Sequence, residues 1–576
     1  MKKSVFLISL LLVAALLLGA CGAETSESTQ KTVKTIDVSL PDGVVEGTYT
    51  ASEVTATLIL NGTEISTDAS SVKVDGSVAT VEKGGVYEVK GLLDDGYIVV
   101  DADKDDEVTL VLNGVGISST SFAAIYVKQA EKVTVYVADG SENYLVNGGA
   151  YELIDDNNTD AAIFSKDDLI FDGGGELTVK AAVGHGIVSK DTTEIQNGVY
   201  NISAASHGVC GKDAVNIGGG TVTVSCGKDG IHAENADDST AGSITVTGGS
   251  ITVCADGDGM SASAELTVDN GVFDITCGGG SDASVNSDVS SKGIKASGKI
   301  VINGGTFTLD SSDDGIHSNS DVTINGGTFS ISTGDDGVHA DGATVIRDGE
   351  LTVLKSYEGV EGLTVEISGG TLRLNASDDG INAAGGNDNS GFGGPRGGDM
   401  FSSSNSSYIK ISGGVIYVNA DGDGVDSNGS LEVSGGSLFV SGPTSNGDGA
   451  LDYDGNGIIS GGTVVAVGSD GMAQNFGTSS SQGSILLSVG NCNSGDKVVL
   501  TDGNGNVLVE YEPEKSYSSV VISCSGLTVG GTYTVSAGDF SESLTLTSLI
   551  YGSGGFGGGG NGGFGGNGGR PGGFGR

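Results

Sequence analysis

Residues 301–340 read VINGGTFTLDSSDDGIHSNSDVTINGGTFSISTGDDGVHA, and two phrases occur twice within them at a spacing of 22 residues. The first phrase is an acidic residue, glycine, an aliphatic residue and histidine, as in residues 314–317 (DGIH). The second phrase is Gly-Gly, then threonine or serine, then an apolar residue, as in residues 304–307 (GGTF). Two phrases that keep one spacing indicate a repeating coil, which is typical of a solenoid.

Both phrases continue far beyond this stretch. The glycine of the first phrase, called the marker glycine below, falls at Gly186, Gly208, Gly230, Gly259, Gly293, Gly315, Gly337, Gly359, Gly380, Gly424, Gly449 and Gly471. The steps between successive marker glycines are 22, 22, 29, 34, 22, 22, 22, 21, 44, 25 and 22 residues. The second phrase keeps the same spacing through Gly249, Gly305, Gly327, Gly370, Gly414, Gly436 and Gly462. The longer steps predict coils with a loop inserted at one corner.

The segments between the phrases predict strands. Alternating runs rich in β-branched residues recur there, for example at residues 244–246, 322–324 and 364–367. Leucine-rich repeats have a similar period, but they require a leucine-asparagine pattern that is missing here. We therefore predict an all-β fold, a right-handed parallel β-helix with about 22 residues per coil and a small C-terminal β domain. Glycine would supply the positive φ that the corners of the coil require.

The sequence outside the repeat predicts the remaining organisation. Residues 58–62 (LILNG) carry a hairpin signal in the lead-in, and the 22-residue spacing is lost after residue 484. The predicted segments are a lipoprotein signal peptide (1–20), a lipidated cysteine and tether (21–35), an N-terminal β cap or lead-in (36–83), the β-helix (84–476, with an insertion at 384–407), the C-terminal β domain (484–548) and a disordered glycine-rich tail (551–576).

The first residues predict the location of the protein. Lys2 and Lys3 precede an apolar run at residues 5–18, which ends in a Leu-Gly-Ala-Cys sequence at residues 18–21 that matches a lipobox. A plain transmembrane anchor is the alternative, but the run is short for a span. We therefore expect lipidation of Cys21 and a protein held by its lipid at the outer surface of the cell membrane.

The other six cysteines allow two predictions. Cys492 and Cys524 lie in the C-terminal segment and could form a disulfide, which an extracytoplasmic location permits. The remaining four fall in consecutive coils without the spacing of a zinc site, so we expect them to pack as small residues: Cys210, Cys226, Cys254 and Cys277.

The acidic residues of the phrase predict a metal site. Equivalent positions of adjacent coils lie about 4.8 Å apart, where two unit charges repel by about 3.5 kcal/mol at an effective dielectric of about 20. A hard divalent cation with oxygen ligands, calcium, would relieve this repulsion. The alternative is that the acids face solvent and cap their own turns. The predicted calcium ligands are Asp256, Asp258, Asp313, Asp314, Asp335, Asp336, Glu358, Asp378, Asp379, Asp421, Asp423 and Asp426.

All five histidines also lie in the first phrase, at His185, His207, His232, His317 and His339. Such regularity argues against five independent catalytic roles. We interpret the position as a surface or corner position of the coil. The alternative is that these histidines mark the face that meets a ligand.

The ordered set of phrases resembles a bacterial family of secreted β-helix carbohydrate-binding domains. The resemblance rests on the DDGIH phrases, on the INGGTF phrases at 302–307 and 324–329, and on an entry segment that begins at residue 85, and it spans roughly residues 84–475. It implies a relative of pectate-lyase helices that holds calcium and binds plant cell-wall polymers such as cellulose and pectic acid.

Charge and composition restrict the ligand. A formal net charge of −47 makes nucleic-acid binding very unfavourable and repels an acidic polysaccharide unless cations bridge the two. The chain contains no tryptophan, so tyrosine or phenylalanine would have to stack against sugar rings. We expect a monomer whose partners are polysaccharide and, through the lipid, the membrane.

Three functions are compatible with these features. The first is a non-catalytic surface lipoprotein that binds polysaccharide of the cellulose or pectic type. The second is a calcium-dependent pectate lyase, whose base would come from Lys292, Lys295, Arg347 or Arg373. The third is a structural or adhesive spacer without a sugar site.

Overall fold

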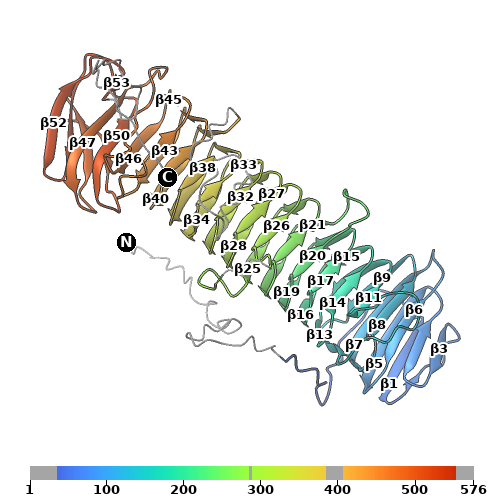
Figure 1. Ribbon diagram of the computed structural model, residues 1–576. Helices are drawn as coiled ribbons and strands as arrows, with labels where there is room; N and C mark the ends of the chain where they lie inside the picture. The colour runs from blue at the N-terminus through green and yellow to red at the C-terminus, as the bar shows by residue number, and fades with distance from the viewer. Residues whose placement is uncertain (1–34, 285–288, 384–405, 553–576) are drawn as a thin grey trace, which may run out of the picture.

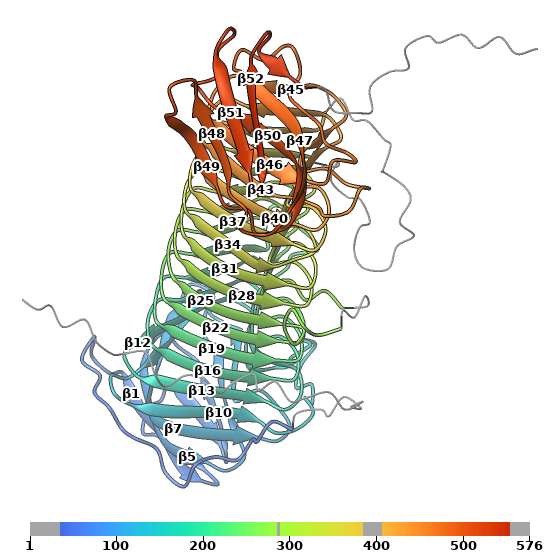
Figure 2. The same cartoon turned by 90° about the vertical axis from the view of Figure 1, so that its left-hand side faces the viewer.

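A computed structural model describes residues 35–284, 289–383 and 406–552. They form a straight rod of stacked β-coils whose C-terminal end is covered by further β-structure (Figures 1 and 2). The described residues contain strands and no α-helix, so they include no helical segment that could cross a membrane. The predictions for the signal peptide, for Cys21, for residues 384–405 of the insertion and for residues 553–576 of the tail lie outside the described residues.

Two long parallel sheets form the wall of the rod. A 16-stranded sheet forms one face. Two further series of parallel strands make up most of a 33-stranded sheet. The 16-stranded sheet, which carries the first phrase, consists of β3 (Val72–Asp75), β4 (Val78–Val81), β6 (Tyr97–Asp101), β8 (Ile125–Gln129), β11 (Ala161–Ser165), β14 (His185–Ser189), β17 (Val209–Gly211), β20 (Ile231–Ala233), β23 (Met260–Ala262), β26 (Ile294–Ala296), β29 (Ile316–Ser318), β32 (Val338–Ala340), β35 (Val360–Glu361), β38 (Ile381–Ala383), β41 (Val425–Ser427) and β44 (Asp452–Tyr453).

The 33-stranded sheet supplies the other two faces. One series consists of β9 (Lys132–Val137), β12 (Asp168–Gly173), β15 (Thr192–Ile195), β18 (Ala214–Ile217), β21 (Ser243–Val246), β24 (Leu266–Val268), β27 (Ile300–Ile302), β30 (Val322–Ile324), β33 (Ala343–Ile346), β36 (Thr364–Ile367), β39 (Tyr408–Ile411), β42 (Ser430–Val433) and β45 (Gly457–Ile459). The other consists of β10 (Glu142–Asn147), β13 (Glu176–Ala181), β16 (Val199–Ala204), β19 (Thr221–Cys226), β22 (Ser250–Ala255), β25 (Val272–Cys277), β28 (Thr306–Ser311), β31 (Thr328–Thr333), β34 (Glu350–Lys355), β37 (Thr371–Ala376), β40 (Val415–Ala420), β43 (Ser437–Ser441) and β46 (Thr463–Gly468).

Shorter groups of strands lie at the two ends. The N-terminal end contains β1 (Ala56–Gly62), β2 (Ile65–Ser66), β5 (Gly85–Leu93) and β7 (Glu107–Ser119). The C-terminal end contains β47 (Ser484–Cys492), β48 (Val498–Asp502), β49 (Val507–Tyr511), β50 (Tyr517–Ser523), β51 (Thr532–Ala537), β52 (Phe540–Thr545) and β53 (Ile550–Tyr551).

Strand pairing follows the repeat in the sequence. Thr306 of β28 pairs with Thr328 of β31, which pairs with Glu350 of β34, so residues 22 apart are neighbours in adjacent coils. The parallel β-coil predicted from the repeat is confirmed, and its handedness stays a prediction.

The 29- and 34-residue steps contain extra residues between strands, as expected, but at two different corners of the coil. The 29-residue step arises between β20 and β21, and the 34-residue step between β25 and β26. The 44-residue step contains the segment between β38 and β39, most of which lies outside the described residues. Pairing of β37 with β40 nevertheless continues the ladder directly across it.

Alternation within each strand builds the core. In β28 and β31 every second residue is buried, so one set of side chains fills the interior of the coil and the other faces outward. Phe273, Phe307 and Phe329 stack inside the rod, with ring centroids 4.5 and 4.6 Å apart and interplanar angles of 4°. Identical positions in successive coils therefore become continuous ladders of packed side chains.

The two phrases need glycine for different reasons. Gly327 of the second phrase has φ +112°, a conformation that favours glycine, as predicted. The marker glycine Gly315 does not have positive φ, so the prediction is wrong for the first phrase. A Cβ at Gly315 would lie 2.7 Å from the carbonyl oxygen of Gly337, the marker glycine of the next coil. Close approach of adjacent coils, rather than corner geometry, excludes a side chain there.

The N-terminal boundary of the coil lies earlier than predicted. β1 and β2 pair antiparallel, as the hairpin signal indicated. However, β1 also pairs parallel with β5, and β4 pairs parallel with β6. Parallel stacking therefore begins within the predicted lead-in and not at residue 84.

The C-terminal strands cover the open end of the last coil. β46 pairs antiparallel with β50, which pairs antiparallel with β47, and β48, β49, β51 and β52 form a separate antiparallel sheet. The disulfide that Cys492 and Cys524 could form is absent, since both are free thiols. Cys492 lies opposite Tyr517, whereas Cys524 follows Ser523 at the other end of the same ladder, and this register separates the two sulfurs. Cys210, Cys226 and Cys277 are buried free thiols, as their interpretation as packed small residues requires. Cys254 is half-buried and disulfide-bonded, so that interpretation is wrong for it.

Candidate functional site

Two columns of side chains run along the 16-stranded sheet, and we call them together the stripe. The first column holds the residue directly before each marker glycine, and the second holds the residue two positions after it. The strands carry second-column residues between two buried neighbours, so these side chains face outward. From His185 to Asp423 the first column reads His185, His207, Asp229, Asp258, Lys292, Asp314, Asp336, Glu358, Asp379 and Asp423, and the second reads Val188, Cys210, His232, Ser261, Lys295, His317, His339, Glu361, Asn382 and Asp426.

First-column carboxylates connect adjacent coils. The backbone N–H of Asp258 donates to Asp229 Oδ1 at 2.9 Å, and that of Asp336 donates to Asp314 Oδ1 at 3.0 Å. The backbone N–H of Asp423 donates to Asp379 Oδ1 at 2.6 Å. Each of these acids thus accepts a hydrogen bond from the backbone N–H of the equivalent residue in the following coil. The acids cap the next coil and not their own turn.

In Asp229 and Asp314 the second carboxylate oxygen contacts a histidine or a lysine of the stripe. His232 Nδ1 lies 2.8 Å from Asp229 Oδ2, and His317 Nδ1 lies 2.8 Å from Asp314 Oδ2. Lys292 Nζ lies 2.7 Å from Asp314 Oδ2 and also 2.7 Å from Asp313 Oδ1. Most of the repulsion expected along the column is therefore offset by neighbouring histidines and lysines.

Buried ion pairs shift the pKa values of this region strongly. Burial lowers the pKa of His339, but contacts with Asp336 and Glu361 outweigh it and raise the pKa to about 12. Burial together with Asp336 and Asp314 raises the pKa of Asp335 to about 8. His339 therefore acts as a fixed cation here and not as a group that titrates near neutral pH.

Near the C-terminal end of the stripe, three acids lie together without a basic side chain from the described part of the chain beside them. One carboxylate oxygen each of Asp379, Asp423 and Asp426 lies within 4.8 Å of the others. No lysine, arginine or histidine of the described residues forms an ion pair with these three. Burial and neighbouring carboxylates raise the pKa of Asp423 to about 8 and that of Asp426 to about 7. We call these three residues the acid-only group.

Asn382 borders the acid-only group. Its strand neighbour is Asp426, and its side chain is only 4% exposed. Its Nδ2 donates to Glu358 Oε2 in the preceding coil at 2.9 Å, whereas its Oδ1 has no hydrogen-bond partner. In the described part of the chain, the side-chain oxygen of Asn382 is therefore buried and unpartnered, in the coil that adjoins that of Asp426.

The structure sorts the twelve predicted ligands into different environments. Asp313, Asp314 and Asp335 form one group, already bound by Lys292, and Asp336 belongs to a second group with His339 and Glu361. Asp379, Asp423 and Asp426 form the acid-only group. The remaining residues stand outside these groups: Asp256 is exposed, Asp258 contacts Lys295 at 3.3 Å, Glu358 is buried against Asn382, Asp378 is half-buried and Asp421 pairs with Lys515 at 2.5 Å.

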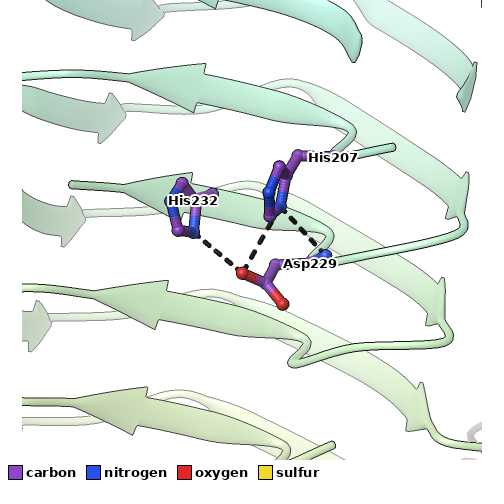
Figure 3. A group of neighbouring side chains, drawn as sticks. All are labelled: His207, Asp229 and His232. Carbon is purple, nitrogen blue, oxygen red and sulfur yellow. Dashed lines mark hydrogen bonds and ion pairs between the residues drawn. The ribbon is translucent and has the colours of Figure 1, made fainter. Parts of the chain in front are cut away.

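Asp229 is a site residue that the sequence reasoning missed. In Figure 3 its carboxylate contacts both His207 and His232, and its Oδ2 is 3.4 Å from His207 Nδ1 and 2.8 Å from His232 Nδ1. Residues 229–232 (DGIH) repeat the first phrase without change, so alignment of the coils by their marker glycines would have found it.

Two hollows lie side by side on this part of the stripe. One has a volume of about 370 Å³ and is lined by His185, His207 and His232. The other has a volume of about 490 Å³, is lined by Asp258, Ser261 and Lys295, and shares His232 and Glu234 with the first. Together they form an open, polar groove across several coils, which we call the stripe groove.

The four cationic residues considered as lyase bases all have other contacts. Lys292 binds Asp313 and Asp314, and Lys295 lies 3.3 Å from Asp258 Oδ2. Arg347 donates to Asn325 Oδ1 at 2.8 Å, and the Arg373 guanidinium lies 4.4 Å from the centroid of the Tyr417 ring. Burial lowers the pKa of Lys292, but Asp314 and Asp313 outweigh it and hold the pKa above its usual value.

Comparison with known proteins gives one family match. Residues 75–337 match a family model described as a carbohydrate-binding domain-containing protein. This match confirms a likeness to carbohydrate-binding domains, over a shorter span than the 84–475 inferred from the sequence.

A relative with the same description comes from Acetivibrio thermocellus (strain ATCC 27405) and is 36% identical over 167 residues. This match covers 28% of the present chain and 57% of the relative, so the chain spans little more than half of that protein. A solved structure of a polysaccharide lyase-like protein from C. thermocellum, a gadolinium derivative, is 32% identical and matches over 43% of this chain and 97% of that one, with a TM-score of 0.40.

Proposed function

We propose that this protein is a non-catalytic cell-surface lipoprotein that binds polysaccharide of the cellulose or pectic type through a calcium-stabilised β-helix. The proposal rests on the position of the stripe groove within the segment that matches the carbohydrate-binding family model. The residues that line the stripe groove fall between 160 and 297, inside the 75–337 segment that matches the carbohydrate-binding family model. An open groove across several coils suits an extended chain of sugars better than a small molecule.

Calcium is assigned to the acid-only group. Three carboxylates and the amide oxygen of Asn382 offer the oxygen ligands that calcium prefers. Asp229, Asp258, Asp314 and Asp336 each have a histidine or lysine beside them, whereas in the acid-only group like charges are buried together. A divalent cation would ionise these carboxylates and join the coils of Asp379 and Asp423.

Sugar contact is assigned to the stripe groove because it holds cations in a strongly acidic protein. Lys190 and Lys212 line its first hollow and Lys295 its second. These ammonium groups would attract uronate carboxylates that the net charge of −47 otherwise repels. Serine hydroxyls and histidine rings in the groove supply hydrogen bonds to sugar hydroxyls.

Binding of the purified protein to polygalacturonate and to cellulose, with calcium or with a chelator, tests the proposal. Absorbance of unsaturated product in the ultraviolet is followed in the same samples. We expect binding without product, reduced by the chelator. Product that grows with time would make the protein a lyase, and failure to bind either polymer would leave the structural or adhesive spacer.

The high pKa of Lys292 bears on the lyase alternative. A lysine that carries its proton at neutral pH is a poor base for abstracting a proton from a sugar. Its two carboxylate contacts at 2.7 Å also occupy the ammonium group. These contacts favour the non-catalytic function.

A lipid anchor at Cys21 is the remaining part of the proposal. Growth with a labelled fatty acid should label the wild-type protein, and the Cys21→Ala variant should lose the label and leave the membrane fraction. A labelled Cys21→Ala protein would contradict the anchor.

A further inference from the structure

The N-terminal part of the stripe differs in chemistry from the rest. Its first column begins with His185 and His207 before the acids start at Asp229, and His232 occupies the second column beside Asp229. The imidazole rings of His207 and His232 are stacked, with centroids 4.3 Å apart. One carboxylate oxygen therefore contacts two stacked imidazoles from adjacent coils (Figure 3).

The geometry points to a binding site for a divalent first-row transition metal ion, such as zinc, formed by His207, Asp229 and His232. One ligand atom of each residue lies within 4.8 Å of the other two. Around tetrahedral zinc, ligands at the usual bond lengths are about 3.3 Å from one another. The separations of 3.4 and 2.8 Å from Asp229 Oδ2 to the two Nδ1 atoms require only small shifts to reach this arrangement.

Both imidazoles have a nitrogen that a metal ion could take. His207 Nδ1 accepts the backbone N–H of Asp229 at 3.1 Å, so it carries a lone pair and no proton. Metal binding would require the His207 ring to turn from this amide, which exchanges one hydrogen bond for a metal bond. His232 Nδ1 lies 2.8 Å from Asp229 Oδ2 and is buried without a hydrogen-bond partner among the described residues, so this nitrogen is available to a metal ion.

The same phrase recurs at residues 314–317 without an imidazole in the first column of the preceding coil, and it serves as an internal comparison. His317 and Asp314 repeat the pair formed by His232 and Asp229, with the same separation of 2.8 Å. The preceding first-column residue is Lys292, whose ammonium group lies 2.7 Å from Asp314 Oδ2. A fixed cation takes the position that His207 has at the proposed site, so no metal ion is expected there.

The donor set distinguishes the proposed site from the acid-only group. Two imidazole nitrogens and one carboxylate favour zinc, nickel or copper over calcium, whereas the acid-only group offers oxygen alone. Three protein ligands leave a coordination position for water or for a ligand oxygen, on the side of the hollow of about 370 Å³. Burial raises the pKa of the Cys210 thiol, which lines the same hollow and is not counted as a ligand.

Titration of the whole protein with zinc tests the inference. The protein is purified without a polyhistidine tag, and calcium is present in excess to fill oxygen sites. We expect one zinc ion per chain, with affinity reduced about 100-fold or more in the His207→Gln and His232→Gln variants, because loss of a ligand costs at least as much as loss of its supporting contact. Cobalt should give the visible absorption of a tetrahedral site in the wild type only.

Matched controls separate the site from general damage to the fold. The His317→Gln variant removes a histidine with the same contact to its acid, and it should bind zinc as the wild type does. Circular dichroism of each variant reports whether the coil is intact. Absence of zinc binding by the folded wild type would overturn the inference. Zinc binding by His207→Gln and His232→Gln as tight as that of the wild type would also overturn it. Polysaccharide is absent throughout, so the outcome is independent of the proposed function.

Discussion

At the scale of single residues, Asp314 of the stripe uses its two carboxylate oxygens for two tasks. Asp314 Oδ1 accepts the backbone N–H of Asp336 in the next coil at 3.0 Å. Its Oδ2 contacts Lys292 at 2.7 Å and His317 at 2.8 Å. The residue therefore joins two coils and also compensates buried charge, which explains why an acid and not only a hydrogen-bond acceptor recurs there.

The Asp314→Ala variant should be destabilised by about 3–5 kcal/mol, because it leaves Lys292 and a backbone N–H buried without this partner. Asp314→Asn keeps the acceptor for the N–H and loses the charge, so it should be destabilised less. Urea unfolding followed by circular dichroism measures both free energies. Equal stability of the alanine and asparagine variants would contradict the two-task interpretation.

At the scale of structural elements, coil spacing depends on the marker glycines. A Cβ at Gly315 would meet the Gly337 carbonyl oxygen at 2.7 Å and Ile331 Cγ2 at 2.6 Å. The same contact recurs from coil to coil, for example between Gly337 and the carbonyl oxygen of Gly359 at 2.5 Å. A strand of the 16-stranded sheet thus fits its neighbour only if this position has no side chain.

Substitution Gly315→Ala should therefore destabilise the rod by about 1–3 kcal/mol, the usual range for overpacking a closely packed site. Gly43→Ala is the matched control, because a Cβ at Gly43 meets no atom within 4 Å and its φ is not in the positive range. Thermal unfolding compares the two variants. A Gly315→Ala protein as stable as Gly43→Ala would show that the coils separate easily.

At the scale of the whole molecule, acidic charge and its compensation vary along the rod. The N-terminal part of the stripe holds histidines and lysines, whereas the acid-only group lies toward the C-terminal end (Figure 1). Sugar binding and calcium binding are therefore assigned to different segments, which allows each to be changed separately.

Stability without calcium should fall as pH rises from about 4 to about 8. The pKa values of Asp423 and Asp426, about 8 and about 7, lie above the ordinary value, so the folded protein keeps protons that the unfolded chain has lost in this range. Calcium should replace these protons and stabilise by about 2.7 kcal/mol at one hundred times its Kd. Melting temperatures across pH, with chelator and with calcium, measure both effects.

Asparagine at both positions, in the Asp423→Asn/Asp426→Asn variant, should reduce the pH dependence and remove the response to calcium. Part of the slope should remain, because Asp335 has a pKa of about 8 and lies in another group. A full calcium response in the double variant would place the ion elsewhere.

Charge reversal in the stripe groove should weaken binding of polygalacturonate. Lys212 lines the groove and pairs with Asp237, which is 82% exposed, so loss of that pair should cost little stability. Lys212→Glu is expected to lower affinity at low salt by about tenfold, since it repels uronate carboxylates. Lys299→Glu, which changes the net charge equally at another surface ion pair with Asp321, should leave affinity nearly unchanged. Equal effects would mean that overall charge and not the groove governs binding.

Much of the fold could be predicted from local sequence. The 22-residue spacing, the alternation in β28 and the positive φ of Gly327 all depend on residues close together in the chain. The Cys492 and Cys524 disulfide could not be judged in this way, because their separation depends on how β47 pairs with β50. Asp229 was visible in the repeat but was overlooked.

The sequence by itself determined the repeat, the direction in which each side chain points and the acidic character of the stripe, because these follow from short-range periodicity. Only the tertiary structure decided which acids have a cation beside them. Lys292 reaches Asp314 from the preceding coil, and Asp423 lies beside Asp379 although 44 residues separate them. Contacts between coils depend on strand register and loop length, which bring together residues that are far apart along the chain.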